Sequence, residues 1–351
     1  MNLTSKHAIA IAVFMIALLA VLIFVMESTG SKKPDPNQPH VELSAWLADW
    51  QWGDGLDEFR QITEGLTSLQ AFAVYFDDKD DLHLTEELRE ALPQIVEASK
   101  QSSLVYVDLT IVNDVILGDG TSVQKDPALV TRLMATEQSR KKHIDNILAA
   151  VTKYDVRGVE IDYENIRSED WDHVLAFYRE LYERLRPLEK SLRIVLEPRA
   201  PIDKLKLPEG PVYVMMAYNL FGNHSGPGPK ADHAFIADLA RRMDKLPGEP
   251  FIAFAAGGFD WAESGKAASV TEEQAAELSQ LSQEAPRRDV GSGSLYFHYT
   301  DDNNVKHTVW YADHVTLAQW IDDARQAGYE KIALWKLGGL GQETLKELNR
   351  Y

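Results

Sequence analysis

The sequence predicts an α/β protein: a (β/α)8 TIM barrel with an α+β insertion after its seventh strand, preceded by one N-terminal transmembrane helix. Strand-like runs alternate with amphipathic helical runs from residue 44 onwards, which is the pattern of a barrel surrounded by helices. The chain has 351 residues, enough for one barrel of about 250 residues and an insertion. No glycine-rich phosphate loop follows any strand-like run, which disfavours an open doubly wound sheet.

The N-terminal region is expected to anchor the chain in a membrane. Residues 8–26 are uncharged and apolar throughout, and at about 1.5 Å per residue such a helix nearly spans a hydrocarbon core of about 30 Å. No small-residue cleavage site follows, so we expect residues 1–26 to be an uncleaved signal anchor rather than a removed signal peptide. Residues 27–43 are polar and proline-rich and are expected to form a linker.

The remaining residues, 44–351, are expected to form the barrel domain. Its eight predicted strands are residues 44–52, 69–76, 104–112, 156–164, 192–198, 212–219, 251–259 and 331–339. The insertion is expected at residues 260–312. Its sequence predicts a helix with a capping box, Thr271 to Gln274, and a hairpin over residues 294–313 that turns near Asn303–Asn304.

Composition excludes several classes of function. The formal net charge is −18 and no basic patch is present, so no nucleic-acid partner is expected. The chain has no cysteine, which excludes disulfides, thiolate metal sites and a cysteine nucleophile. Its ten histidines show no metal-binding spacing, and we expect neither a metal nor another cofactor.

The run VRGVEIDYE, residues 156–164, carries three acids on one face. Glu160, Asp162 and Glu164 alternate with apolar residues, which is strand geometry. An edge strand could simply show these acids to water. In a barrel they face the lumen instead and rise toward the C-terminal end, where catalytic groups lie. Glu164 is the last of the three and suits a general acid, because a neighbouring carboxylate and apolar walls would raise its pKa.

This run resembles the signature D-G-x-D-x-D-x-E of glycoside hydrolase family 18, the chitinase family, with Gly158, Asp162 and Glu164 matching. MMAYN at 215–219 resembles the family's M-x-Y-D, and IALWKLGG at 332–339 resembles its tryptophan-bearing last strand. The C-terminal stretch, residues 307–339, is similar to the bacterial spore-cortex and germination N-acetylglucosaminidase branch. The resemblance covers roughly residues 41–351.

The resemblance implies a retaining, substrate-assisted glycosidase acting after N-acetylglucosamine. It implies that Glu164 is the general acid and base, that Asp162 accepts a hydrogen bond from the acetamide N–H, and that Tyr218 donates to the acetamide oxygen. Trp335 would give the sugar ring a flat apolar face. The other substrate-binding candidates in these motifs are Glu160, Met216 and Asn219.

The sequence departs from the family pattern at three positions. Glu160 is one methylene longer than the expected aspartate, Asn219 replaces an aspartate, and Arg157 replaces a mainly structural acid. Because Asn219 removes a charge but can still form hydrogen bonds, we expect it to alter the pH dependence rather than to abolish activity.

Aromatic and polar residues at other strand ends are further candidates. Trp50 and Trp261 are expected to line a sugar cleft, with core and loop packing as the alternative. Tyr75, Asp77, Asp108 and Asn113 are weaker candidates for contacts with sugar hydroxyls. Glu197 is expected to be either a site residue or a salt-bridge partner of Arg199.

These expectations define the predicted partner and location. The partner would be an N-acetylated polysaccharide, peptidoglycan or a chitin-like glycan, and the chain would be a monomer held by its N-terminal helix, with the barrel outside the cytoplasm. Two alternatives remain: a weakly active or inactive carbohydrate-binding or scaffold protein, and a metal-dependent barrel enzyme that uses the acids as ligands.

Overall fold

The computed structural model describes residues 41–62, 65–102 and 105–351. The predicted anchor, residues 1–26, and nearly all of the predicted linker, residues 27–43, lie outside this part of the chain. Within it, no helix combines the length and the apolar character needed to cross a membrane.

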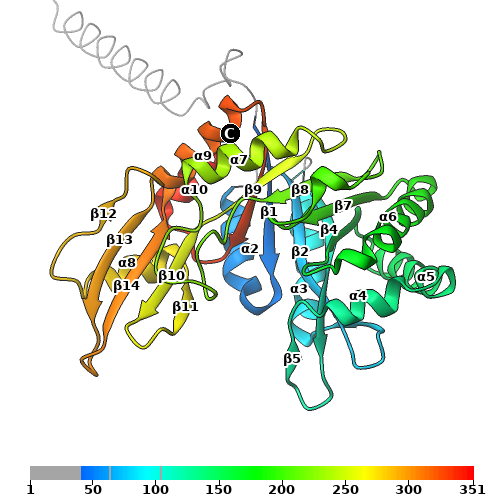
Figure 1. Cartoon of the computed structure of the whole chain (residues 1–351), viewed down its shortest axis with the longest axis horizontal. Coiled ribbons are helices and arrows are strands. Elements are labelled where there is room, and N and C mark those ends of the chain that lie inside the picture. Colours follow the sequence, from blue (N-terminus) through cyan, green and yellow to red (C-terminus); the bar gives the residue numbers. More distant parts are fainter. Residues whose placement is uncertain (1–40, 63–64, 103–104) are drawn as a thin grey trace, which may run out of the picture. The chain divides into compact units, whose positions relative to one another are not determined.

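Eight parallel strands form a closed barrel in the described part of the chain, as predicted (Figure 1). Each strand pairs with the next one around the ring, and the last strand pairs with the first. The strands are β1 (Glu42–Ala48), β2 (Leu66–Phe76), β4 (Tyr106–Ile116), β6 (Gly158–Asp162), β7 (Ser191–Leu196), β8 (Val212–Met216), β9 (Phe251–Ala255) and β15 (Lys331–Leu337). Two short strands, β3 (Leu82–Leu84) and β5 (Ser122–Val123), extend the ends of β2 and β4.

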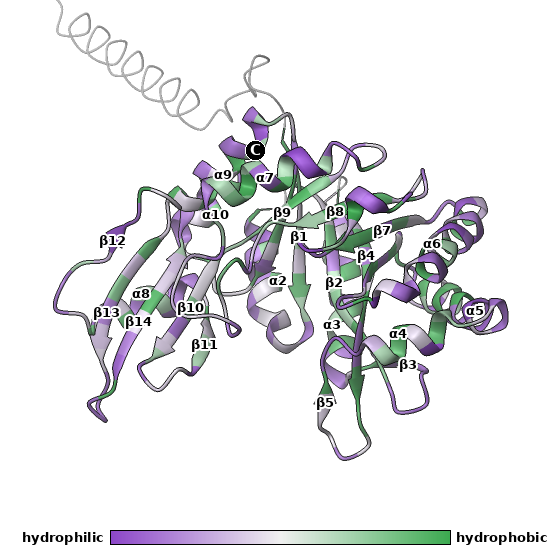
Figure 2. Cartoon of the chain, in the orientation of Figure 1, coloured by the Kyte–Doolittle hydropathy of each residue, from purple (hydrophilic) through white to green (hydrophobic). Residues whose placement is uncertain are grey.

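Amphipathic helices cover the outside of the barrel because their apolar faces pack on the outward-facing residues of the strands. The helices are α2 (Trp52–Gln61), α3 (Glu86–Gln101), α4 (Pro127–Met134), α5 (Glu137–Lys153), α6 (Trp171–Leu185), α7 (His233–Met243), α9 (His314–Gln326) and α10 (Gln342–Leu348). Figure 2 shows apolar residues along the barrel strands and mixed polarity on the helices. A separate, smaller apolar cluster that includes Trp46, Met216 and Tyr218 fills the lumen.

The first and seventh predicted strands were too long. β1 ends at Ala48, because Asp49–Gln51 form a 3-10 turn that leads into α2, so Trp50 lies beyond the strand. The run 251–259 is split between β9 and the insertion strand β10 (Gly257–Ala262). Gly257 has a φ of +63°, and a Cβ there would lie 2.4 Å from the carbonyl oxygen of Val270. Glycine therefore permits the chain to leave the barrel at this point.

The insertion is a five-stranded antiparallel sheet packed on one helix. Its strand order is β11 (Ala267–Val270), β10, β14 (Lys306–Ala312), β13 (Leu295–Thr300) and β12 (Arg287–Arg288), and its helix is α8 (Glu272–Ser279). The capping box of Thr271 and Gln274 is confirmed, as is the hairpin, in which Asn304 adopts a φ of +61°.

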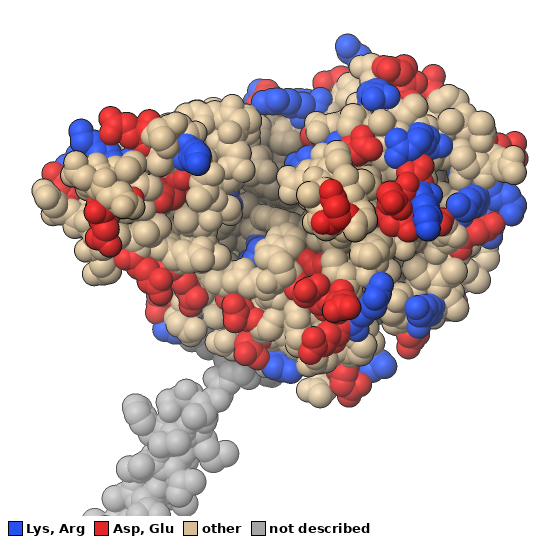
Figure 3. Space-filling model, turned by 90° about the horizontal axis from the view of Figure 1, so that it is seen from below, with Lys and Arg blue, Asp and Glu red and all other residues tan. Residues whose placement is uncertain are grey.

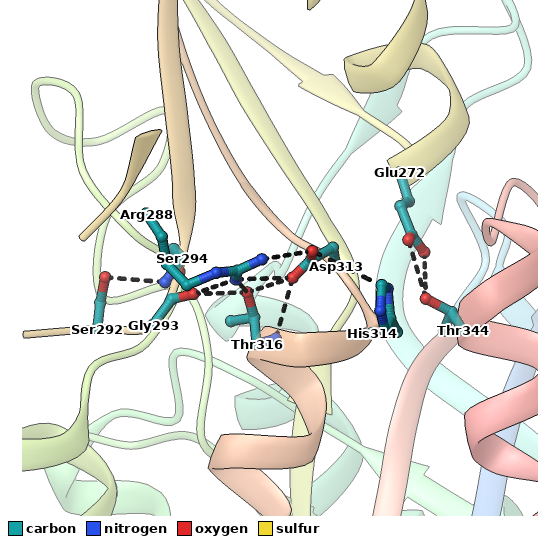
Figure 4. Close-up of polar contacts among 9 residues, drawn as sticks. All are labelled: Glu272, Arg288, Ser292, Gly293, Ser294, Asp313, His314, Thr316 and Thr344. Carbon is teal, nitrogen blue, oxygen red and sulfur yellow. Dashed lines mark hydrogen bonds and ion pairs between the residues drawn. The ribbon is translucent and has the colours of Figure 1, made fainter. Parts of the chain in front are cut away.

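Buried polar contacts fix this insertion to the barrel helices (Figure 4). The Glu272 carboxylate accepts hydrogen bonds from the Thr344 hydroxyl at 2.7 and 2.9 Å and from the backbone N–H of Gly341 at 2.9 Å. Arg288 donates to both carboxylate oxygens of Asp313 at 2.7 and 2.9 Å, next to the start of α9. These charge-assisted contacts thus hold the insertion against the starts of α9 and α10.

Candidate active site

The three acids of β6 and its C-terminal end point into the barrel, as predicted, while Val159, Ile161 and Tyr163 pack outside against the helices. Glu160, the first acid, is completely buried. Its carboxylate accepts from Trp46 Nε1 at 2.5 Å, Thr110 Oγ1 at 2.9 Å and Arg193 Nε at 2.9 Å. Burial raises the pKa of Glu160, and the charge of Arg193 opposes that rise.

Asp162, the second acid, lacks such a cation. It is nearly buried, and its Oδ1 has no hydrogen-bond partner among the described residues. Burial first, and then the charges of Glu164 and Glu160, raise its pKa well above the usual value. An unpaired buried carboxyl oxygen is costly in a folded protein, and such groups are concentrated at functional sites.

Glu164, the third acid, follows the end of β6 and is held by two neighbours. The Asn113 side chain bonds both backbone groups of Glu164: its amide donates to the carbonyl oxygen at 3.0 Å and its oxygen accepts the N–H at 2.9 Å. The carboxylate Oε2 lies 2.5 Å from Lys125 Nζ. Burial raises the pKa of Glu164, as expected, although the Lys125 ammonium opposes that rise.

A pocket of about 670 Å³ opens at the C-terminal end of the barrel and brings most of the predicted residues together. Predicted residues that line it are Asp162, Glu164, Tyr218, Met216, Asn219, Trp335, Trp50 and Tyr75. A second pocket of about 380 Å³ shares Glu164 and Tyr218 with the first, so the cleft continues on both sides of Glu164. Figure 3 views the molecule from below the orientation of Figure 1 and shows a hollow whose rim is mostly uncharged, with charged side chains at parts of it.

An aromatic group forms one wall of the larger pocket. The ring of Trp335 lies 4.7 Å from that of Phe72, 5.9 Å from that of Trp46 and 6.4 Å from that of Trp50. Trp50 is 58% exposed, which is unusual for a residue of its size. Flat, partly exposed aromatic faces of this kind suit an apolar sugar face.

Tyr75 and Tyr218 have different hydrogen-bonding environments. The Tyr75 hydroxyl donates to Asp49 Oδ1 at 3.1 Å, so this tyrosine is tied to the wall of the pocket. Tyr218 lies in the luminal cluster, and burial together with the charges of Asp162 and Glu164 raises its pKa well above the usual value. Its hydroxyl therefore keeps its proton and can act as a donor.

Comparison with known proteins identifies the family. Residues 124–339 match the model of "Glycosyl hydrolases family 18", which is more than half of the chain. The chain belongs to glycoside hydrolase family 18. Its acid strand, the tyrosine after β8 and the tryptophan of β15 all lie within the matched range.

Relatives of this family 18 chain include proteins of Bacillus. The cortical fragment-lytic enzyme of Bacillus anthracis is 26% identical over 80% of this chain and 66% of its own length. The uncharacterized glycosylase YvbX of Bacillus subtilis is 22% identical over 73% and 77%. The crystal structure of the Bacillus cereus spore cortex-lytic enzyme SleL shares the fold, with a TM-score of 0.73 and 21% identity over 88% of this chain and 74% of that one.

Two of the predicted substrate-binding residues lie away from the family 18 pocket. Glu160 is paired with Arg193 beneath the pocket and does not line it. Trp261 is buried in the insertion, where its indole N–H donates to the Ser225 carbonyl oxygen at 3.2 Å and its ring lines a different cavity of about 940 Å³. The fold takes Trp261 away from the site because β10 belongs to the second sheet.

The weaker candidates have varied roles. Asp108 is buried and bonds the Ser191 hydroxyl at 2.8 Å, and Asp77 bonds backbone groups within its own loop. Glu197 lines the smaller pocket and accepts the N–H of Asn165 at 2.7 Å. Asn113 lines the larger pocket, and its side chain also holds both backbone groups of Glu164.

The three departures from the family pattern each have a structural context. Glu160 is long enough to reach Arg193, and Asn219 lines the pocket with a φ of +60°, a conformation that asparagine tolerates well. Arg157 donates to the carbonyl oxygen of Glu189 and lies 5.6 Å from the ring centroid of Tyr106.

Sequence reasoning missed Lys125, Arg193 and Phe72. No local sequence pattern predicts them, because each lies on a different strand or loop and reaches the site only in the folded chain. Among the described residues, no group of three or more His, Asp or Glu side chains is arranged to hold a metal ion.

Proposed function

We propose that this family 18 glycoside hydrolase is a retaining, substrate-assisted N-acetylglucosaminidase that cleaves β-1,4 bonds after N-acetylglucosamine. The observation that carries the proposal is one pocket lined by Asp162, Glu164, Tyr218 and Trp335. The unpaired Oδ1 of Asp162 is a ready acceptor for an acetamide N–H, and the Tyr218 hydroxyl is a donor for the acetamide oxygen.

In this mechanism the substrate supplies its own nucleophile. Glu164 gives its proton to the glycosidic oxygen while the acetamide oxygen bonds to the anomeric carbon, and the bond to the leaving sugar breaks. Asp162 stabilises the positive charge that develops on the acetamide nitrogen. Water then attacks the anomeric carbon, its proton returns to Glu164, and the acetamide is restored.

The proposed substrate is peptidoglycan, with chitin-like glycans as the alternative. Relatives named as cortical fragment-lytic and spore cortex-lytic enzymes support peptidoglycan. We also propose that the apolar segment 8–26 tethers a monomeric barrel outside the cytoplasm, where such a polymer would be reached.

Hydrolysis of purified glycans by the full chain and by Glu164→Gln tests the proposal. Loss of the acid should lower turnover by about 10²-fold or more while the fold and sugar binding remain. New reducing N-acetylglucosamine ends, identified by mass spectrometry on peptidoglycan or on chitin oligosaccharides, would name the substrate.

The same experiment separates the scaffold alternative, which the pairing of Glu164 with Lys125 favours. Binding without cleavage by the wild type would support a carbohydrate-binding protein. Equal turnover by the wild type and Glu164→Gln would contradict the assignment of Glu164.

A further inference from the structure

Lys125 lies in the loop between β5 and α4, and this loop is fastened to the end of β4. The backbone N–H of Lys125 donates to Asp114 Oδ1 at 2.8 Å, and the N–H of Asp126 donates to the Asn113 carbonyl oxygen at 2.9 Å. The Asn113 amide also donates to the Asp126 carbonyl oxygen at 3.2 Å. The lysine backbone is therefore fixed, in the left-handed region with a φ of +51°.

Asn113 links this loop to Glu164. The side chain that holds Asp126 also holds both backbone groups of Glu164. The Lys125 side chain extends from this loop to the Glu164 carboxylate, and its Nζ lies 2.5 Å from Oε2. The Asn113 side chain thus fixes the backbone on both sides of the ion pair. This support distinguishes the ion pair from a contact between two mobile surface side chains.

We propose that Lys125 is a positioning residue for Glu164: its ammonium holds the carboxylate in the free enzyme and stabilises it as the base of the second step. This inference rests on the proposed role of Glu164. When the leaving sugar enters, the glycosidic oxygen must take the position beside Glu164, so the ammonium must give way. The Lys125 side chain is 42% exposed, which leaves it room to move.

Lys125 opposes the effect of the other charged groups around Glu164 on the pKa of that residue. The titratable groups that face it from the packed elements are Asp114 on β4, Asp162 on β6, Glu197 after β7 and Tyr218 after β8, besides Lys125 itself. The three carboxylates all favour the protonated form of Glu164, and Lys125 alone of this group favours the ionised form. Desolvation lowers the pKa of Lys125, but the charge and hydrogen bond of Glu164 together with the charges of Asp162 and Glu197 outweigh it, so that pKa is raised and the ammonium stays charged.

The proposal is tested by the pH dependence of kcat/KM, whose alkaline limb reports the general acid of the free enzyme. Removing the cation with Lys125→Met should raise the pKa of Glu164 and move this limb upward by about one pH unit. Lys125→Arg keeps a cation and should restore the wild-type limb. Lys142→Met removes an exposed lysine that pairs with Asp81 at 3.0 Å, and this control should leave the limb unchanged.

An NMR titration of isotope-labelled glutamate gives a readout independent of turnover. The Glu164 signal is assigned by its loss in Glu164→Gln, and its pKa should rise in Lys125→Met and not in Lys142→Met. A limb and a Glu164 titration that both stay at the wild-type position in Lys125→Met would overturn the proposal. Full turnover by Glu164→Gln would instead overturn the proposed function.

Discussion

Asp162 and Glu160 are two residues apart on β6, yet of the two only Glu160 forms an ion pair with a described residue. The ion pair with Arg193 balances the charge of Glu160 in the barrel interior, where an unpaired carboxylate would be costly. Asp162 lies next to both acids, and one of its oxygens has no hydrogen-bond partner in the part of the chain that the structure describes. The arrangement leaves Asp162 as the carboxyl group that is free to accept a hydrogen bond from a ligand.

Trp335 is the aromatic residue that should contribute most to sugar binding, since it lines the pocket beside Glu164 and is supported by Phe72. Trp335→Ala should weaken binding of N-acetylglucosamine oligosaccharides by about tenfold or more, because aromatic contacts are typically worth about 0.5–1.5 kcal/mol beyond the area they bury. Isothermal titration calorimetry with Glu164→Gln as the background measures this. Trp261→Phe, in the other cavity, is the control, and an equal loss of affinity in both variants would contradict the placement.

Sequence reasoning at this scale found the acids but not their partners. Alternation along one strand is enough to place Glu160, Asp162 and Glu164 on one face. The partners Arg193 and Lys125 come from other strands and loops, and their side chains carry no periodic signal. Which acid is paired and which is free depends on the register between neighbouring strands, such as Glu160 opposite Arg193.

At the scale of elements, α8 is the link between the insertion and the barrel. Glu272 is the first residue of this helix, is nearly buried, and binds the Thr344 hydroxyl and the N–H of Gly341 at the start of α10 (Figure 4). The contact joins two helices through residues that are 72 positions apart in sequence. It is a charge-assisted hydrogen bond, which is stronger than one between neutral groups.

Glu272→Ala should therefore lower the free energy of unfolding by about 1–3 kcal/mol, because it leaves the Gly341 N–H and the Thr344 hydroxyl without their buried acceptor. Urea unfolding measures the loss, and hydrogen exchange should locate it in α8 and α10. Glu273→Ala is the matched control, since Glu273 is the next residue of the same helix and is exposed. Similar losses in both variants would indicate a helix effect instead of this contact.

Element boundaries were predicted less well than element types. The capping box and the hairpin of the insertion are local signals, and both were predicted correctly. The division of residues 251–259 between two sheets depends on the close approach of Gly257 to Val270, which is a contact between distant residues. The apolar run itself gives no sign of it, because both halves are buried.

At the scale of the whole molecule, the alternation of strands and helices predicted the barrel because each crossover must return to a parallel neighbour.

The packing between barrel and helices contains a buried histidine that no sequence pattern predicted. His143 on α5 is fully buried, its Nε2 lies 2.7 Å from the Tyr163 hydroxyl, and its ring stacks 5.2 Å from that of Phe177. Burial lowers the pKa of His143 from 6.5 to about 3.

This histidine should make the fold sensitive to acid. Between its folded pKa of about 3 and its unfolded value of 6.5, the unfolded chain binds a proton that the folded chain does not, so stability falls as pH falls through that window. From about pH 7 to about pH 5 the loss from this one group is about 2 kcal/mol. His143→Gln can keep a donor near Tyr163 but cannot titrate. From about pH 7 to about pH 5 the free energy of unfolding of this variant should therefore fall by about 2 kcal/mol less than that of the wild type.

Urea unfolding of both proteins at the two pH values measures the difference, and His298→Gln, which changes an exposed histidine on β13, is the control. Comparing the pH dependence rather than the stability itself removes any cost of the substitution at neutral pH. Parallel loss of stability in the wild type and His143→Gln would show that His143 binds its proton equally well in the folded and the unfolded chain, which would contradict the lowered pKa. The acid sensitivity would then come from the carboxylates of this strongly acidic chain, whose net charge is −18.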